Sequence, residues 1–131
     1  MDRSALSRQA LEYALETFPD ADVTVLHVVG EPSPMLGAAT GLALEDDLPA
    51  AAKERAEGVF ETAQKVASEH GVEVKTTVAA GHPARTIVDR AAEFDTVVIG
   101  SHGGTLRDRL FVGNVAETVF RRSPVPVTVV R

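Results

Sequence analysis

The chain contains no cysteine, and this absence removes several kinds of site at once. A disulfide framework, a thiolate zinc site and a cysteine nucleophile all require a thiol. The apolar runs are too short to span a membrane, and the polar start, Met1 to Ser4, lacks the apolar stretch of a signal peptide. We therefore expect a protein of the reducing cytoplasm, without a membrane-bound part.

Positive charge is also scarce, with 13 Lys and Arg against 19 Asp and Glu and a net charge of -6. This balance argues against a broad nucleic-acid-binding face, although a local anion site remains compatible with it. With 131 residues, 44% of them hydrophobic and 24% charged, the composition is that of a globular protein. We expect one folded domain that spans residues 1–131.

Apolar residues at three- and four-residue spacing alternate along the chain with short β-branched runs. The first pattern begins after a predicted N-cap at Ser4 and is closed by Pro19. Gly71 ends the longest helical pattern, and Gly81-His82-Pro83 opens the next. A loop of small residues with no period, Gly30 to Asp47, is a candidate lid. The predicted helices cover about 5–18, 47–70, 83–92 and 114–122, and the predicted strands cover 23–29, 72–78, 96–100 and 125–130.

Strands that alternate with helices of this length predict right-handed crossovers and an α/β fold. We expect an open, doubly wound, mainly parallel sheet with helices on both faces. The strands 23–29 and 96–100 are almost wholly apolar, which predicts interior positions covered on both sides. The strand 72–78 alternates with polar residues, and the strand 125–130 contains Pro126, so both are predicted to be edges. The first helix follows no strand, so the sheet lacks its expected first strand.

The segment with most chemical content follows the buried strand that ends at Gly100. Gly103 and Gly113 come next, and a helix opens at Gly113-Asn114. Glycines let backbone N–H groups approach a ligand, and a helix N-terminus offers unpaired donors and the positive end of the helix dipole. These features are those of a phosphate cradle. On spacing alone an equal alternative is that the glycines only form tight turns and Asn114 only caps a helix.

The spacing Gly100-x-x-Gly103, nine residues, then Gly113 resembles the nucleotide-binding signature of the universal stress protein family, Gly-x-x-Gly-x(9)-Gly-Ser/Thr. The residues around it are similar to the family as well, as are Leu26-His27-Val28 and Gly81-x-Pro83. The similarity runs from Asp2 to Arg131. It implies a Rossmann-like fold, and a family in which some members bind ATP and others do not.

The resemblance also implies roles for individual residues. Val28 or Val29 would lie against the adenine, and Asp2 matches the aspartate that contacts it. Asn114 stands where the family has a hydroxyl residue, a departure that alters the expected geometry at the phosphate although an Asn amide can still donate. The residues expected around the ribose and phosphates are Gly100, Gly103, Gly113, Asn114 and Val115.

Two histidines adjoin these positions. His102 lies in the glycine turn and is a candidate phosphate contact, against the alternative of a solvent-facing loop residue. His27 lies in a buried strand pattern and is expected to be a core histidine with its ring hydrogen-bonded. No metal-ligand set and no Ser-His-Asp or paired-carboxylate arrangement can be assembled from the sequence, so no catalytic residues are assigned.

The function that the resemblance implies is a stress-response protein that binds ATP, with Mg²⁺, and acts as a nucleotide-dependent regulatory module. Any ATP hydrolysis is expected to be slow. The alternative is a dimerisation or interaction module of the same fold that has lost nucleotide binding. A nucleotidyl transferase or phosphatase is a further alternative, disfavoured because no base, nucleophile or carboxylate cluster is present.

The resemblance implies two further expectations about the sheet. One is a homodimer in which the last strands, Val125 to Val130, meet across a two-fold axis. In the family the first strand lies between the two interior strands, so we expect 23–29 and 96–100 not to touch. We accordingly expect the chain as given to be an N-terminally shortened form of limited stability.

Overall fold

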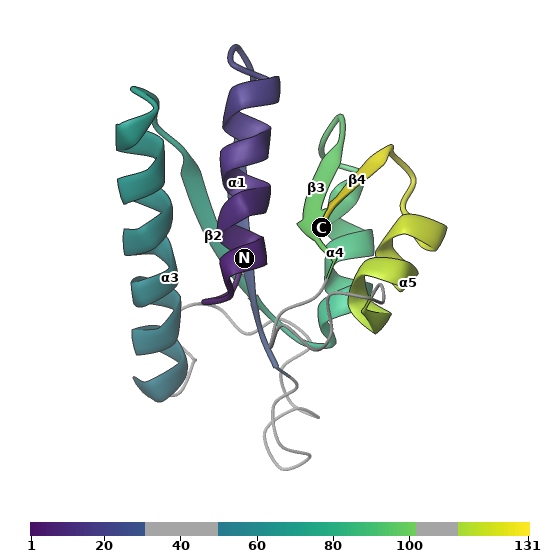
Figure 1. The fold of residues 1–131 in the computed structure, drawn as a ribbon. Coiled ribbons are helices and arrows are strands. Elements are labelled where there is room, and N and C mark those ends of the chain that lie inside the picture. The colour runs from purple at the N-terminus through teal and green to yellow at the C-terminus, as the bar shows by residue number, and fades with distance from the viewer. Residues whose placement is uncertain (31–49, 102–112) are drawn as a thin grey trace.

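The structure of the chain is a computed structural model that describes residues 1–30, 50–101 and 113–131 (Figure 1). The candidate lid up to Asp47, with the expected helix cap at that residue, lies outside these ranges except for Gly30. His102 and Gly103 also lie outside them. The helices and strands alternate as predicted. In chain order they are α1 (Ala5–Thr17), β1 (Thr24–Val29), α3 (Ala50–Glu69), β2 (Lys75–Ala80), α4 (Pro83–Ala91), β3 (Val97–Gly100), α5 (Asn114–Arg122) and β4 (Val127–Val130).

The helix boundaries follow local chemistry that the sequence displays. The Ser4 hydroxyl caps α1 by accepting the N–H of Ser7 at 3.1 Å. After α3 the chain turns at Gly71, whose φ of +71° is a conformation that glycine adopts without steric cost. Pro83 is the first residue of α4, where its missing N–H costs nothing. These predicted signals are confirmed.

All strand pairs are parallel, and they form two separate two-stranded sheets within the described residues. β1 pairs with β2, so that His27 lies opposite Val78 and Val28 opposite Ala79. β3 pairs with β4, so that Ile99 lies opposite Val129. The prediction that the strands starting near Val23 and Thr96 do not pair with each other is confirmed. The α/β, mainly parallel, doubly wound class is confirmed as well, with the sheet divided between β1 and β3.

Three details of the strand predictions are wrong. The strand predicted at 72–78 runs from Lys75 to Ala80, because its ladder with β1 begins where Lys75 pairs with Thr24. The last strand starts at Val127, after Pro126. Neither expected interior strand is covered throughout: only Val25 and His27 of β1 are buried, and every residue of β3 is half-buried. Each of these two strands pairs with a single strand among the described residues, so neither is an interior strand there.

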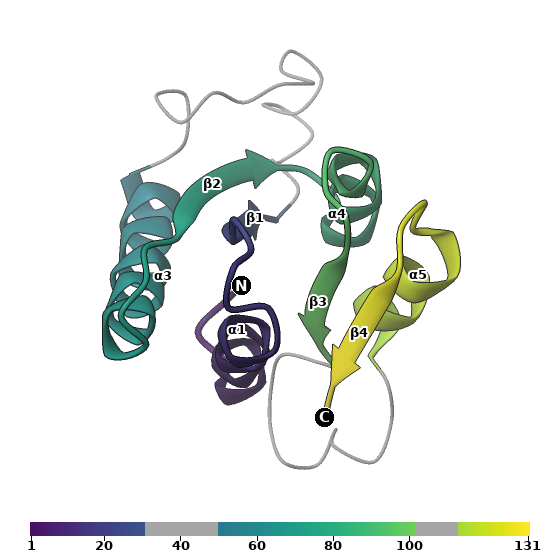
Figure 2. The same ribbon diagram turned by 90° about the horizontal axis from the view of Figure 1, so that it is seen from above.

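The helices cover both sides of the strands (Figure 2). On one side α1 packs against α3, β3 and β4, and α3 packs against β1. On the other side α4 packs against α5 and β1, while α5 also contacts β4. The core between β1 and the first layer is built from Leu11, Leu15, Val25, Ala63, Val66, Ala67 and Val74.

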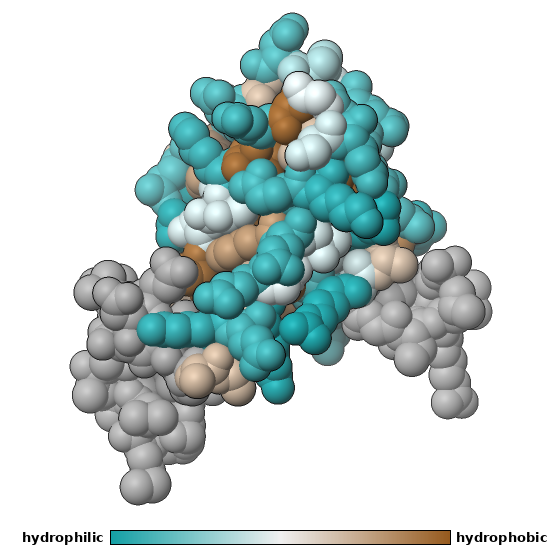
Figure 3. Space-filling view, turned by 90° about the vertical axis from the view of Figure 1, so that its left-hand side faces the viewer, coloured by the Kyte–Doolittle hydropathy of each residue, from teal (hydrophilic) through white to brown (hydrophobic). Residues whose placement is uncertain are grey.

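The molecule's side beside α3 is predominantly hydrophilic, with small apolar areas between the charged side chains (Figure 3). Along α3 the buried residues recur at three- and four-residue spacing, from Ala56 and Val59 to Ala67, and the charged residues between them are exposed. This helix therefore faces solvent on one side and the core on the other. The features that gather functional residues lie elsewhere, at the carboxyl ends of β1 and β3.

Candidate functional site

A cavity of about 560 Å³ lies where β1 and β3 end. Its wall combines the N-terminal segment, the carboxyl-terminal halves of these two strands, the first residues of α4 and the first turn of α5. Ligands of open α/β folds bind at this end of parallel strands, where the chain leaves the sheet in opposite directions. The lining residues are Met1, Asp2, Ser4, Ser7, Leu26, His27, Val28, Pro83, Ile87, Ile99, Gly100, Ser101, Gly113, Asn114, Val115 and Ala116.

Most of the residues singled out from the sequence lie together around this cavity. Asp2 and Val28 line one part of it, and Gly100 ends β3. The start of α5 contributes Gly113, Asn114 and Val115, so these residues meet although they are far apart in the chain. Val29 does not line the cavity. The roles of these residues toward a nucleotide remain predictions.

Gly100 has a packing role that the sequence did not reveal. A Cβ added to it would lie 3.1 Å from the backbone carbon and 3.2 Å from the backbone oxygen of Leu6 in α1. Backbone atoms cannot move aside as a flexible side chain can. The absence of a side chain at Gly100 is therefore explained by the close approach of α1, with or without a ligand.

The N-terminus of α5 opens into the cavity. Gly113 is its N-cap, with φ −66° and ψ 159°, and as a glycine it supplies no side-chain capping hydrogen bond. Asn114 is the first helical residue, so the alternative in which it serves as the cap is wrong. The N–H groups of the first helical turn have no partner within the helix, and the helix dipole adds partial positive charge. The wall formed by Gly113 to Ala116 is therefore suited to an anion.

Ser101 links three elements at the floor of the cavity. Its N–H donates to the carbonyl of Val130 at 2.7 Å, and its carbonyl accepts the N–H of Gly113 at 2.8 Å. The residue is only 2% exposed, and among the described residues its Oγ has no hydrogen-bond partner. A buried hydroxyl without a partner costs about 1–3 kcal/mol. Ser101 was missed in the sequence because a serine between Gly100 and His102 looks like an ordinary turn residue.

The N-terminal segment forms another part of the wall. The Asp2 carboxylate accepts the N–H of Ser4 at 2.7 Å, and the Ser7 hydroxyl donates to the Asp2 carbonyl at 3.0 Å. Partial burial alone would raise the pKa of the Asp2 carboxyl group, but hydrogen bonds from Ser4 and Ser7 outweigh it and lower the pKa below its usual value. Asp2 is therefore an ionised hydrogen-bond acceptor at neutral pH.

His27 anchors this segment to β1. Its Nδ1 lies 2.7 Å from the carbonyl oxygen of Met1, and the Met1 amine donates to the carbonyl of the neighbouring Leu26. His27 is 9% exposed, and its ring and that of Phe60 in α3 form a T-shaped pair, with 6.5 Å between ring centroids and an interplanar angle of 87°. The prediction of a hydrogen-bonded core histidine is confirmed.

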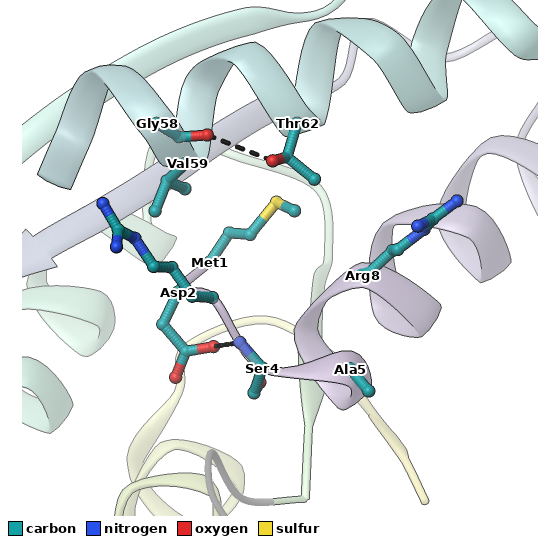
Figure 4. A pocket seen from close by; sticks show the side chains of 9 residues that line it. Met1, Asp2, Ser4, Ala5, Arg8, Gly58, Val59 and Thr62 are labelled. Atoms are coloured by element: carbon teal, nitrogen blue, oxygen red, sulfur yellow. Dashed lines mark hydrogen bonds between the residues drawn. The ribbon is translucent and has the colours of Figure 1, made fainter.

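A second cavity, of about 540 Å³, lies on the other side of the N-terminal segment, against α3 (Figure 4). Arg3 and Arg8 line it together with Gly58 and Thr62 of α3. Arg8 pairs with Glu12 at 3.2 Å, and the guanidinium of Arg3 lies 3.2 Å from where a Cβ on Gly58 would be. Met1, Asp2 and Ser4 line both cavities. The N-terminal segment therefore borders both cavities.

Two other features bear on the function. In the part of the chain that the structure describes, no three His, Cys, Asp or Glu side chains gather closely enough to hold a metal ion. No helix among the described residues is long and apolar enough to cross a lipid bilayer.

Comparison with known proteins decides the family. The model of the Universal stress protein family matches residues 1–131. The chain belongs to this family. Universal stress protein MJ0531 of Methanocaldococcus jannaschii is 33% identical over 136 residues, which cover 99% of this chain and 78% of that protein. Universal stress protein YxiE of Bacillus subtilis is 29% identical over 140 residues, covering 100% of this chain and 95% of that protein.

Solved structures of universal stress proteins share the fold. UspA from Lactobacillus plantarum matches with a TM-score of 0.77 and 26% identity, over 100% of this chain and 93% of that one. A universal stress protein in complex with cAMP matches with a TM-score of 0.72 and 22% identity, and one from Archaeoglobus fulgidus in complex with dAMP with 0.71 and 18%. Both matches extend over 100% of this chain and 92% of the chain in the solved structure.

Proposed function

We propose that this universal stress protein binds ATP in the cavity between the ends of β1 and β3. The observation that carries the proposal is the N-terminus of α5, whose glycine N-cap supplies no side-chain hydrogen bond and which lines that cavity through Gly113 to Ala116. Unpaired N–H groups at the positive end of a helix dipole are a phosphate-binding device. The Oγ of Ser101 in the same wall, which has no hydrogen-bond partner among the described residues, is a second polar group that a ligand oxygen could bond.

The rest of the cavity fits a nucleoside. Val28 and Ile99 offer apolar surface at the strand ends, and the ionised Asp2 carboxylate can accept a hydrogen bond from an exocyclic amine. A volume of about 560 Å³ is within the range of small-molecule sites. Solved relatives of the same fold were captured with adenine nucleotides, cAMP and dAMP, which supports the choice of base.

Mg²⁺ would come with the nucleotide. The described residues contain no group of three carboxylate or imidazole side chains that could hold the ion by themselves. Bound to the phosphates, the ion would neutralise part of their charge. The residues of the chain would bind and orient the nucleotide through α5 and the N-terminal segment.

The role proposed for this binding is regulatory, in the stress response, through a nucleotide-dependent conformation or choice of partner. No catalytic arrangement was found in the sequence, so ATP hydrolysis, if measured, should be slow. One observation favours the alternative of an interaction module without nucleotide: Asn114 occupies the position of the family's hydroxyl residue at the start of α5.

Mass spectrometry of small molecules released from gently purified protein tests the proposal directly. ATP or ADP at near-stoichiometric amounts is the expected result. A thermal denaturation series with ATP and MgCl₂ gives the affinity, because a ligand at one hundred times its Kd adds about 2.7 kcal/mol of stability. An unchanged melting curve at millimolar ATP, with no nucleotide released, would favour the interaction module.

A further inference from the structure

The N-terminal segment has little packing around it. Met1, Asp2 and Ser4 border the cavity at the strand ends and also the second cavity against α3. Only the side chain of Met1 packs against the core. Hydrogen bonds with Ser4 and Ser7 hold Asp2 to the start of α1. Contacts of Met1 with β1 fix the other end of the segment and so complete the placement of the Asp2 carboxylate.

Two hydrogen bonds supply this hold on β1. One joins the Met1 amine to the carbonyl of Leu26 and involves backbone atoms alone. The other joins the Met1 carbonyl, at 2.7 Å, to the imidazole of His27. Because a carbonyl oxygen can only accept, Nδ1 of His27 must carry the proton and donate it. His27 is thus the one side chain among the described residues that hydrogen-bonds to Met1.

The imidazole is itself fixed in place. His27 lies within the ladder between β1 and β2, opposite Val78, and its ring forms a T-shaped pair with Phe60 of α3. A buried ring held by a strand and a helix has little freedom to move. Its donor nitrogen therefore has a defined position, one residue from Val28, which lines the cavity.

We infer that His27 is a positioning residue for base recognition: it holds the Met1–Asp2 segment so that the Asp2 carboxylate faces the base. The inference rests on the proposed nucleotide binding and assigns the source of its adenine selectivity. The phosphate half of the cavity, at Ser101 and the start of α5, is held by separate backbone contacts to Val130 and Gly113. Loss of the His27 hydrogen bond should therefore weaken recognition of the base and spare recognition of phosphate.

Two substitutions separate this role from a general effect on folding. His27→Leu keeps an apolar side chain beside Phe60 and removes the donor. His27→Asn loses the ring but places an amide N–H close to where Nδ1 lies, and so is the rescuing variant. Isothermal titration would compare ATP, GTP and inorganic tripolyphosphate, each with MgCl₂, on the wild type and both variants.

In His27→Leu we expect ATP affinity to fall about two- to tenfold, with the preference for ATP over GTP falling by the same factor. Tripolyphosphate affinity should change less than twofold, and His27→Asn should recover most of the ATP affinity. Equal losses for ATP and tripolyphosphate, or no loss at all, would overturn the inference. Wild-type protein that binds tripolyphosphate but shows no preference for ATP would also overturn it and leave the phosphate site standing.

If His27→Leu does not fold, the positioning role of His27 can still be tested on the wild-type protein. Nitrogen-15 NMR of the imidazole should show Nδ1 protonated in the neutral ring. An Nε2–H tautomer would contradict donation to Met1 and with it the positioning role. Wild-type protein that binds neither ATP nor tripolyphosphate would instead reject the proposed function, and the positioning role with it.

Discussion

The carbonyl of Ser101 accepts the N–H of Gly113 at 2.8 Å, and this hydrogen bond closes the chain between the end of β3 and the start of α5. The residues between them lie outside the described ranges, yet both anchors of that segment are fixed. The N–H of Ser101 donates to the carbonyl of Val130, so both the N–H and the carbonyl of Ser101 make hydrogen bonds within the protein. The side-chain hydroxyl is the polar group of Ser101 that makes none among the described residues.

Ser101→Ala should separate ligand binding from stability. Removal of a buried hydroxyl that has no partner among the described residues should leave the melting temperature of the nucleotide-free protein unchanged or slightly raised. If the hydroxyl bonds a nucleotide oxygen, ATP affinity should fall about two- to tenfold. Scanning calorimetry of the nucleotide-free protein measures the melting temperature, and titration calorimetry with ATP measures the affinity. A lower melting temperature without ligand would show that Oγ has a partner within the protein.

Gly113→Val should abolish the increase in melting temperature that ATP produces. The φ and ψ of Gly113 are extended and open to any residue, so the backbone should tolerate valine while the branched side chain obstructs the anion wall. Gly30→Ala is the matched control, because a Cβ there meets nothing within 4 Å. An ATP shift retained in Gly113→Val would exclude this wall as the phosphate site.

Asn114→Ser restores the hydroxyl residue that the family signature carries at this position. Asn114 is the first helical residue and exposed, so the exchange should cost little stability. We expect tighter ATP binding by titration calorimetry. The hydroxyl of the shorter serine side chain lies close to the backbone N–H groups of the first turn, so both can donate to the same phosphate. Equal or weaker affinity would show that the Asn amide is a competent substitute.

The pair His70–Glu16 predicts a dependence of stability on pH. The hydrogen bond between Nδ1 and the Val66 carbonyl, at 2.9 Å, and then Glu16 raise the pKa of His70 above its usual 6.5. The resulting stabilisation should be complete below pH 6.5 and disappear as the pH rises through the folded-state pKa. NMR titration should show a lower midpoint in Glu16→Gln and an unaltered one in Glu93→Gln. The same midpoint in all three proteins would contradict the assignment.

The last strand provides a test of assembly. β4 pairs with β3 and has no second strand neighbour among the described residues, so its outer edge is a surface for pairing with a second copy. If the protein is a homodimer through Val125 to Val130, Val129→Lys should give monomers in light scattering. Tyr13→Lys, on α1, is the control. A dimer that persists in Val129→Lys would place the interface elsewhere.

The predictable parts of the fold depend on local chemistry. Ser4, Gly71 and Pro83 mark helix boundaries by properties of single residues, and each acts as the sequence indicates. The start of β2 at Lys75 was missed because it depends on where β1 lies, and alternation alone continues back to Val72. The residue pattern within a segment predicts whether a helix or a strand forms. Where a strand begins and ends depends on the strand it pairs with.

The candidate site was predictable to a smaller extent. Glycine spacing and the family resemblance found Gly113 and Asn114, but neither could show that the Ser101 hydroxyl is buried with no partner among the described residues. The contact between His27 and Met1 joins residues 26 positions apart, so no local pattern contains it. The close approach of Leu6, which leaves little room for a side chain at position 100, is likewise a product of tertiary packing.

The division of the strands into two pairs determines how the molecule unfolds. A two-stranded sheet is marginally stable at best, so neither pair should persist without its helices. The contacts that join the two halves come from helices: α1 reaches α3 on one side and β3 on the other, and α4 reaches both β1 and α5. Cooperativity therefore depends on helix packing. Leu6, buried where α1 meets Gly100, is one of the side chains on which this joining depends.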